Sequence, residues 1–159
     1  MDFTIKSLSD LLKPLIERGF LFKSHKEFAE DNSPVNKNDN FIILRHDVDL
    51  KPYHSLKTAI IESNLGIRGT YYFRMVPESY NEDVVKQIAD LGHEIGYHYE
   101  NIDWVSTRFR VQGVRFRNAE EEREKIIDAA YADFCEKLEK FRKIYPVKTI
   151  CMHGSPRSP

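Results

Sequence analysis

The sequence of 159 residues predicts an α/β protein built around a parallel sheet. Strand-like and helix-like segments alternate after residue 40, which is the order of right-handed βαβ units. The first strand-like run is continuously apolar, as is typical of a strand buried on both faces of a parallel sheet. Acidic and histidine residues follow three of the predicted strands, and α/β sheets form their sites at such strand ends.

The first forty residues, 1–40, predict a helical extension that packs on the α/β domain. A helix is expected over residues 7–18, with Ser7 or Ser9 as its cap and an apolar face of leucine and isoleucine. Pro14 should bend this helix or delay its start, because proline lacks the backbone N–H. The remaining expectations are an apolar piece at 20–22, a turn of helix at 25–30 and a loop at 31–40.

Residues 41–159 form the second predicted domain. Its expected strands are residues 41–44, 69–73, 93–98 and 149–152, and its expected helices are residues 53–64, 82–91 and 119–145. Asn81 should cap the second of these helices, and Pro146 should end the third. Over residues 104–118, four arginines are interleaved with apolar residues around Gly113. This pattern favours an amphipathic hairpin over a site for an anionic partner.

The composition argues against several classes of function. The formal net charge of -1 gives no basic field, so nucleic acid is not an expected partner. No run reaches the ~20 apolar residues of a membrane span, and no targeting signal is visible. Cys135 and Cys151 are too few for a disulfide framework and fit a reducing compartment, so we expect a cytoplasmic protein.

Two acidic residues end the first predicted strand. Asp47 and Asp49 are two positions apart, so both carboxylates face the same side while the backbone stays extended. Two neighbouring carboxylates do not both ionise easily without a cation. One could therefore bind a divalent metal while the other acts as a general base. The alternative is a pair of solvated acids at a strand end.

Two histidines lie at the ends of later strands. His98 ends the third predicted strand and is a candidate metal ligand. His153 follows the fourth strand, as either a turn residue or a site residue. His93 begins the third strand and is expected to be structural. His46 has the opposite parity to the acidic pair and should pack behind the site or orient a ligand.

Four residues close to His98 can each be interpreted in two ways. Glu100 or Asp103 could complete a metal shell, or both could be exposed loop acids. Tyr97 and Tyr99 could provide stacking surface for a sugar ring, although aromatic residues at strand ends more often belong to the core.

Three segments together resemble the polysaccharide deacetylase superfamily, also called the NodB-homology or carbohydrate esterase family 4 group. They are ILRHDVD at residues 43–49, GTYYF at 69–73 and LGHEIGYH at 91–98, in the family's order and spacing. The resemblance covers about residues 41–156. It implies a partial or distorted (β/α) barrel whose C-terminal strands and later motifs would lie beyond residue 159.

The resemblance also implies roles for individual residues. Asp47 matches the family's general base, Asp49 a metal ligand, and His98 the first histidine of the H-x-x-x-H motif. The second histidine of that motif is replaced by Ile102. Glu100 is therefore the expected third ligand, with Asp103 and His153 as alternatives. His153 also stands where the family has an arginine that steadies the base, and is expected to act there as a catalytic residue.

The family's activity is removal of N-acetyl groups from sugar polymers, or hydrolysis of related C–N bonds, with a divalent metal that is often zinc. We therefore expect a metal-dependent hydrolase acting on a carbohydrate substrate that carries N-acetyl groups. The alternatives are a catalytically impaired or truncated relative that serves as a binding or structural module, and a glycosyltransferase that uses Asp-x-Asp. The last would need a nucleotide-binding first half, which the sequence does not display.

Overall fold

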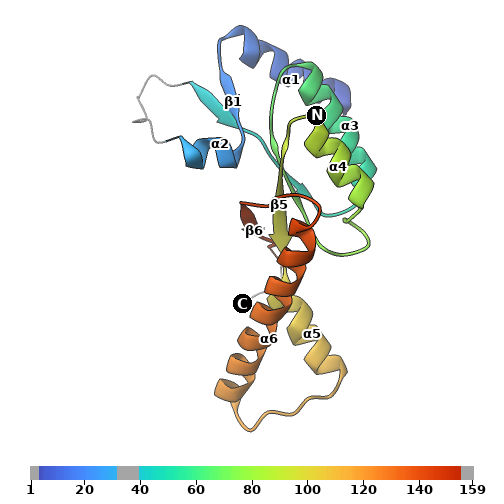
Figure 1. Cartoon of the computed structure of the whole chain (residues 1–159), viewed down its shortest axis with the longest axis vertical. Coiled ribbons are helices and arrows are strands. Elements are labelled where there is room, and N and C mark those ends of the chain that lie inside the picture. Colours follow the sequence, from blue (N-terminus) through green and yellow to red (C-terminus); the bar gives the residue numbers. More distant parts are fainter. Residues whose placement is uncertain (1–3, 32–39, 155–159) are drawn as a thin grey trace.

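The computed structural model describes residues 4–31 and 40–154 of the chain (Figure 1). The helices are α1 (Ile5–Glu17), α2 (His25–Glu30), α3 (Pro52–Asn64), α4 (Glu82–Asp90), α5 (Asn101–Val111) and α6 (Ala119–Arg142). The strands are β1 (Leu21–Lys23), β2 (Phe41–Ile43), β3 (Arg45–Val48), β4 (Thr70–Phe73), β5 (Glu94–Tyr99) and β6 (Ile150–Met152). The structure is therefore mixed α/β, as the sequence predicts.

The main sheet has four parallel strands in the order β3-β4-β5-β6. Each strand pairs with the next strand of the sheet along the chain, and helices fill the crossovers. Consequently the carboxyl ends of the strands lie along one edge of a curled sheet. The predicted parallel sheet is confirmed, and no helix of the described part of the chain is long and apolar enough to cross a membrane.

The prediction of one buried strand at residues 41–44 is wrong. β2 ends at Ile43 and β3 begins at Arg45, and the two strands belong to different sheets. β2 is only half-buried and pairs in parallel with β1, which lies in the predicted helical extension. The hydrogen bond from the Thr70 N–H to the Leu44 carbonyl (2.9 Å) starts the pairing of β3 with β4.

The N-terminal segment contains the expected helices but differs in detail. Thr4 caps α1 by accepting a hydrogen bond from the Ser7 N–H (3.2 Å), so the helix starts earlier than predicted. α1 continues through Pro14. At α2, the buried Glu94 carboxylate accepts a hydrogen bond from the Lys26 N–H (2.8 Å), which attaches this helix to the main sheet. Most of the predicted loop at 31–40 lies outside the described residues.

The predicted hairpin at residues 104–118 is also wrong. Most of it forms α5, which packs beside α6 at one end of the molecule (Figure 1). Gly113 has a φ of 65° just after the helix, which is the left-handed conformation that commonly ends helices. Val105 is buried, and Lys137 of α6 lies over the Trp104 ring at 5.3 Å. The apolar residues therefore follow a helical period rather than a strand alternation.

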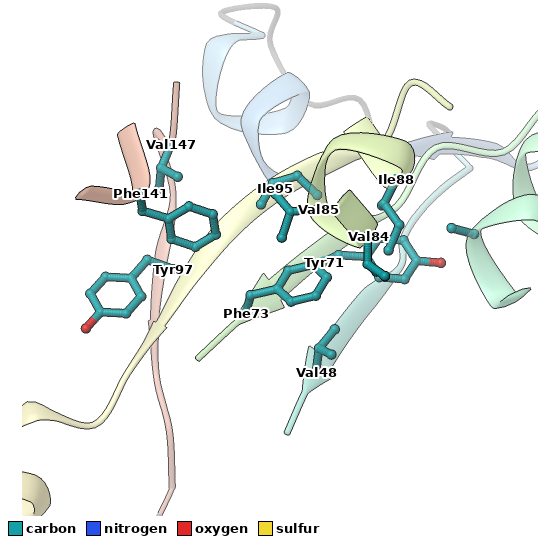
Figure 2. Close-up of a cluster of buried hydrophobic side chains, with 11 residues drawn as sticks. Val48, Tyr71, Phe73, Val84, Val85, Ile88, Ile95, Tyr97, Phe141 and Val147 are labelled. Carbon is teal, nitrogen blue, oxygen red and sulfur yellow. The ribbon is translucent and has the colours of Figure 1, made fainter. Parts of the chain in front are cut away.

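One face of the main sheet carries the hydrophobic core. Figure 2 shows Val84 and Ile88 of α4 against Tyr71 of β4, and Phe141 of α6 near Tyr97 of β5. All five side chains are at most 2% exposed. The expected Asn81 cap is confirmed by its hydrogen bond from the Val84 N–H (3.0 Å). Both α4 and α6 thus cover this face, and the polar residues lie on the opposite face of the main sheet.

A carboxylate lies inside this core. Glu62 of α3 is 0% exposed and accepts a hydrogen bond from the Tyr71 hydroxyl (2.8 Å). The Nε2 atom of His46 lies 2.7 Å from its other oxygen, and the His46 ring stacks on Tyr71. His93 is buried nearby and receives the Gly69 N–H on Nδ1 (3.0 Å). His93 is thus structural, and the His46 side chain lies on the core face of β3, behind the face that carries Asp47, as the sequence indicates.

Replacing Glu62 by alanine should destabilise the fold. Glu62→Ala leaves the buried Tyr71 hydroxyl without its acceptor and opens a cavity, so we expect the free energy of unfolding to fall by about 3 kcal/mol. Chemical denaturation followed by circular dichroism measures this loss. Glu139→Ala, on the exposed side of α6, is the control and should change stability by less than about 0.5 kcal/mol. Equal effects of the two substitutions would contradict the role of Glu62.

Candidate metal centre

The face of the sheet opposite the core is polar. Side chains alternate between the two faces of a strand, so Asp47 shares a face with its register partner Tyr72 and with Gly96 next to it. Two residues beyond Gly96, His98 of β5 lies on the same face, opposite Cys151 of β6. This alternation places the candidate site residues together at the carboxyl ends of β3, β5 and β6.

His98 is the centre of the cluster. Its side chain is 2% exposed, and its Nδ1 atom lies 3.1 Å from the Cys151 carbonyl oxygen. A carbonyl can only accept a hydrogen bond, so Nδ1 carries the proton and Nε2 presents a lone pair. Burial lowers the pKa of His98 below its ordinary value, against the opposing effect of the carbonyl and the nearby carboxylates. The ring is therefore a neutral imidazole of the kind that binds metals.

Three further groups face that nitrogen. Asp49 Oδ1 lies 3.7 Å from His98 Nε2, and Asp47 Oδ2 lies 3.8 Å from it. The Nδ1 atom of His153 lies 3.2 Å from His98 Nε2 and 3.3 Å from Asp49 Oδ1. Asp49 Oδ1 is buried and has no hydrogen-bond partner. A buried acceptor without a donor is costly, and a cation among these atoms would satisfy it.

Asp47 differs from Asp49 because an arginine holds it. The Arg45 guanidinium donates to both carboxylate oxygens of Asp47, from Nε at 2.8 Å and from Nη2 at 2.7 Å. Burial acts to raise the pKa of Asp47, but these bonds and the nearby positive charges outweigh it and hold the pKa below its ordinary value. Asp47 therefore remains an ionised acceptor at neutral pH.

These residues form two groups with the geometry to hold a metal ion. One contains Asp49, His98 and His153, and the other contains Asp47, His98 and Cys151. In each group the ligand atoms lie within 4.8 Å of one another. The mixed oxygen, nitrogen and sulfur donors suit a divalent cation of borderline softness. The chain can thus hold a divalent metal ion here.

The structure does not bring Glu100 into this cluster. Its carboxylate is bound by the Arg74 guanidinium, with two contacts of 2.8 Å and one of 3.0 Å. The same guanidinium donates to the Asp49 carbonyl (3.3 Å). Glu100 therefore helps to position the end of β3, and His153 stands where a third ligand is needed. Ile102 is 51% exposed on α5, and Asp103 belongs to neither of the two groups found among the described residues.

The tyrosines expected to bind substrate belong to the core side of the sheet. Tyr97 is 2% exposed, and its hydroxyl donates to Asn101 (3.2 Å). Burial raises its pKa to about 12. Tyr99 is half-buried and packs edge-on against Phe134 of α6. Both residues have the opposite parity to His98, so their place in the strand directs them away from the cluster.

Arg45 and Tyr72 also lie at the site, although no sequence motif assigned them to it. The spacing of two between Arg45 and Asp47 was the available signal, because it places both on one face of β3. Tyr72 lies between Arg45, whose guanidinium is 5.5 Å from its ring, and the His98 ring at 6.4 Å. A Cβ at Gly96 would collide with the Tyr72 ring, so this glycine permits the ring to lie flat on the sheet.

No protein-family model, curated protein or solved structure matches the chain.

Removing the Arg45 guanidinium should raise the pKa of Asp47. In Arg45→Ala the burial of the carboxylate remains while its strongest hydrogen bonds are lost, so we expect an increase of about one pH unit or more. A pH titration of the side-chain carboxyl carbon by NMR measures it. Arg108→Ala, on the exposed side of α5, is the control and should leave the Asp47 titration unchanged. An unchanged pKa in Arg45→Ala would show that Arg45 does not hold the carboxylate.

Proposed function

We propose that this chain is a metal-dependent hydrolase that removes N-acetyl groups from amino sugars. The observation that carries the proposal is the convergence of Asp49, His98 and His153 on one point, with Asp47 beside them as a separately held carboxylate. Three ligands and one base outside the ligand set are the groups that metal-assisted amide hydrolysis requires.

The ligand set fits a divalent ion. Asp49 offers a buried oxygen without a donor, and His98 offers a neutral nitrogen. His153 offers Nδ1 at the same point. Zinc is the ion we propose, because imidazole and carboxylate ligands are typical of catalytic zinc sites. When bound there, the ion supplies Lewis-acid polarisation of a carbonyl oxygen and lowers the pKa of water.

Asp47 is the proposed general base. Its carboxylate lies beside the ligand cluster and is oriented by Arg45, so it can take the proton of an attacking water. The low pKa that Arg45 imposes keeps Asp47 ionised but also makes it a weak base. The water must therefore be made more acidic for Asp47 to deprotonate it. The proton that Asp47 takes from the water then passes to the leaving amine, so the hydrolysis is balanced in protons.

The substrate class comes from the family resemblance. The residues that match the polysaccharide deacetylase motifs, Asp47, Asp49 and His98, are the ones that lie together in the cluster. The curled parallel sheet is compatible with a partial barrel of the deacetylase type. His153 differs from the family pattern and in our proposal replaces the second histidine ligand, while Arg45 supplies the contact that steadies the base.

Metal binding tests the ligand assignment. Isothermal titration of apo protein with zinc or cobalt should give one binding site. His98→Ala, or Asp49→Ala combined with Cys151→Ser, should weaken it by more than about 100-fold, because each of these variants removes a ligand from both groups. His54→Ala is the control, because His54 is an exposed histidine on α3. Binding that is absent from the unsubstituted chain, or unaffected in both ligand variants, would disprove the metal centre.

Catalysis tests the role of Asp47. Acetate release from acetylated chito-oligosaccharides should fall by about 10²–10⁴-fold in Asp47→Asn, while zinc affinity at the Asp49 position changes little. Removal of the metal with a chelator should abolish release, and added zinc should restore it. Zinc binding without acetate release from the unsubstituted chain would instead favour a metal-binding module without catalytic activity.

A further inference from the structure

We propose that Cys151 is a metal ligand that forms, with Asp47 and His98, a second position for a soft divalent cation. A cation in this second position prevents metal binding by Asp49, His98 and His153, which form the Asp49 position. This inference rests on the proposed function only where it assigns Asp47 as the base. The cluster of Asp47, His98 and Cys151 meets the distance requirement for a metal site by itself.

The parallel register of the sheet supports this assignment. Cys151 of β6 is the register partner of His98 on β5, so both side chains point to the polar face. The backbone of the same residue fixes the imidazole, because the Cys151 carbonyl receives the His98 Nδ1 proton. The thiol thus lies at a defined place beside the ring.

The second position and the Asp49 position cannot be filled together. His98 Nδ1 is committed to the carbonyl, so only the Nε2 lone pair is available, and both groups require His98. A cation at the Asp49 position leaves Asp47 free. A cation at the second position takes Asp47 as a ligand and competes with Arg45 for it. With a metal in the second position, Asp47 is a ligand and is no longer available as a base.

Ligand chemistry separates the ions that fill the two positions. The Asp49 position has only oxygen and nitrogen donors, whereas the second position adds a thiol that releases its proton to solvent as the metal–sulfur bond forms. Thiolates favour soft ions such as cadmium over manganese or magnesium, and cobalt accepts sulfur as well as oxygen and nitrogen ligands. We expect cadmium to occupy the second position and manganese to occupy the Asp49 position.

Cobalt absorption spectroscopy is the direct test, because a sulfur–cobalt bond gives an intense near-ultraviolet charge-transfer band that oxygen and nitrogen ligands do not give. Apo protein titrated with cobalt should develop this band, and Asp49→Ala should retain it because the second position remains intact. Cys151→Ser should lose the band and bind cadmium at least about tenfold more weakly, with manganese affinity unchanged. Cys135→Ser, at the half-buried cysteine of α6, is the matched control and should keep the band.

The outcomes separate this inference from the proposed function. Cobalt that binds without the band, in both the unsubstituted chain and Asp49→Ala, overturns the role of Cys151 and leaves the hydrolytic site untouched. A band that persists in Cys151→Ser overturns it as well. A cobalt band from a chain that releases no acetate when manganese fills the Asp49 position supports the ligand and rejects the hydrolase. Circular dichroism of Cys151→Ser verifies that the variant is folded.

Discussion

The parallel pairing of β5 with its neighbours is the constraint on which the rest of the structure depends. It aligns His98 with Cys151 on one side and, two residues earlier, Gly96 with Tyr72 on the other. Since alternate residues of a strand point to opposite faces, this register sends the imidazole to the polar face and Tyr97 into the core. A shift of one residue would exchange the two faces and remove both the core and the site.

The two faces handle buried charge differently. On the core face, Glu62 is fully buried but has the Tyr71 hydroxyl and the His46 imidazole as partners. On the polar face, Asp49 Oδ1 is buried without a donor. Each carboxylate therefore has one oxygen without a hydrogen-bond partner that lies beside a histidine nitrogen, Glu62 Oε1 beside His46 and Asp49 Oδ1 beside His153. Among the described residues, however, the groups of three side chains that could hold a metal ion lie on the polar face, and this convergence is the physical argument for a cation at the strand ends.

Two arginines decide which carboxylates take part in the cluster. Arg74 binds Glu100 and the Asp49 carbonyl, which fixes the end of β3 while withdrawing one acid from the site. Arg45 binds Asp47 in a bidentate contact that keeps it ionised without burying it fully. Carboxylates of similar chemistry therefore have different roles. The contact with Arg74 gives Glu100 a structural role, and the contact with Arg45 orients Asp47 beside the ligands.

Local patterns in the sequence determined the strand–helix alternation and the position of Asp47, Asp49 and His98 at strand ends, because these follow from periods of 2 and 3.6 residues. Tertiary structure decided that the run at residues 41–48 is divided between two sheets. It also decided that a helix follows β5, because packing against α6 overrides the local pattern there. It also decided that His153 joins the cluster. Its distance to Asp49 depends on a strand register set across more than one hundred residues, which no local period encodes.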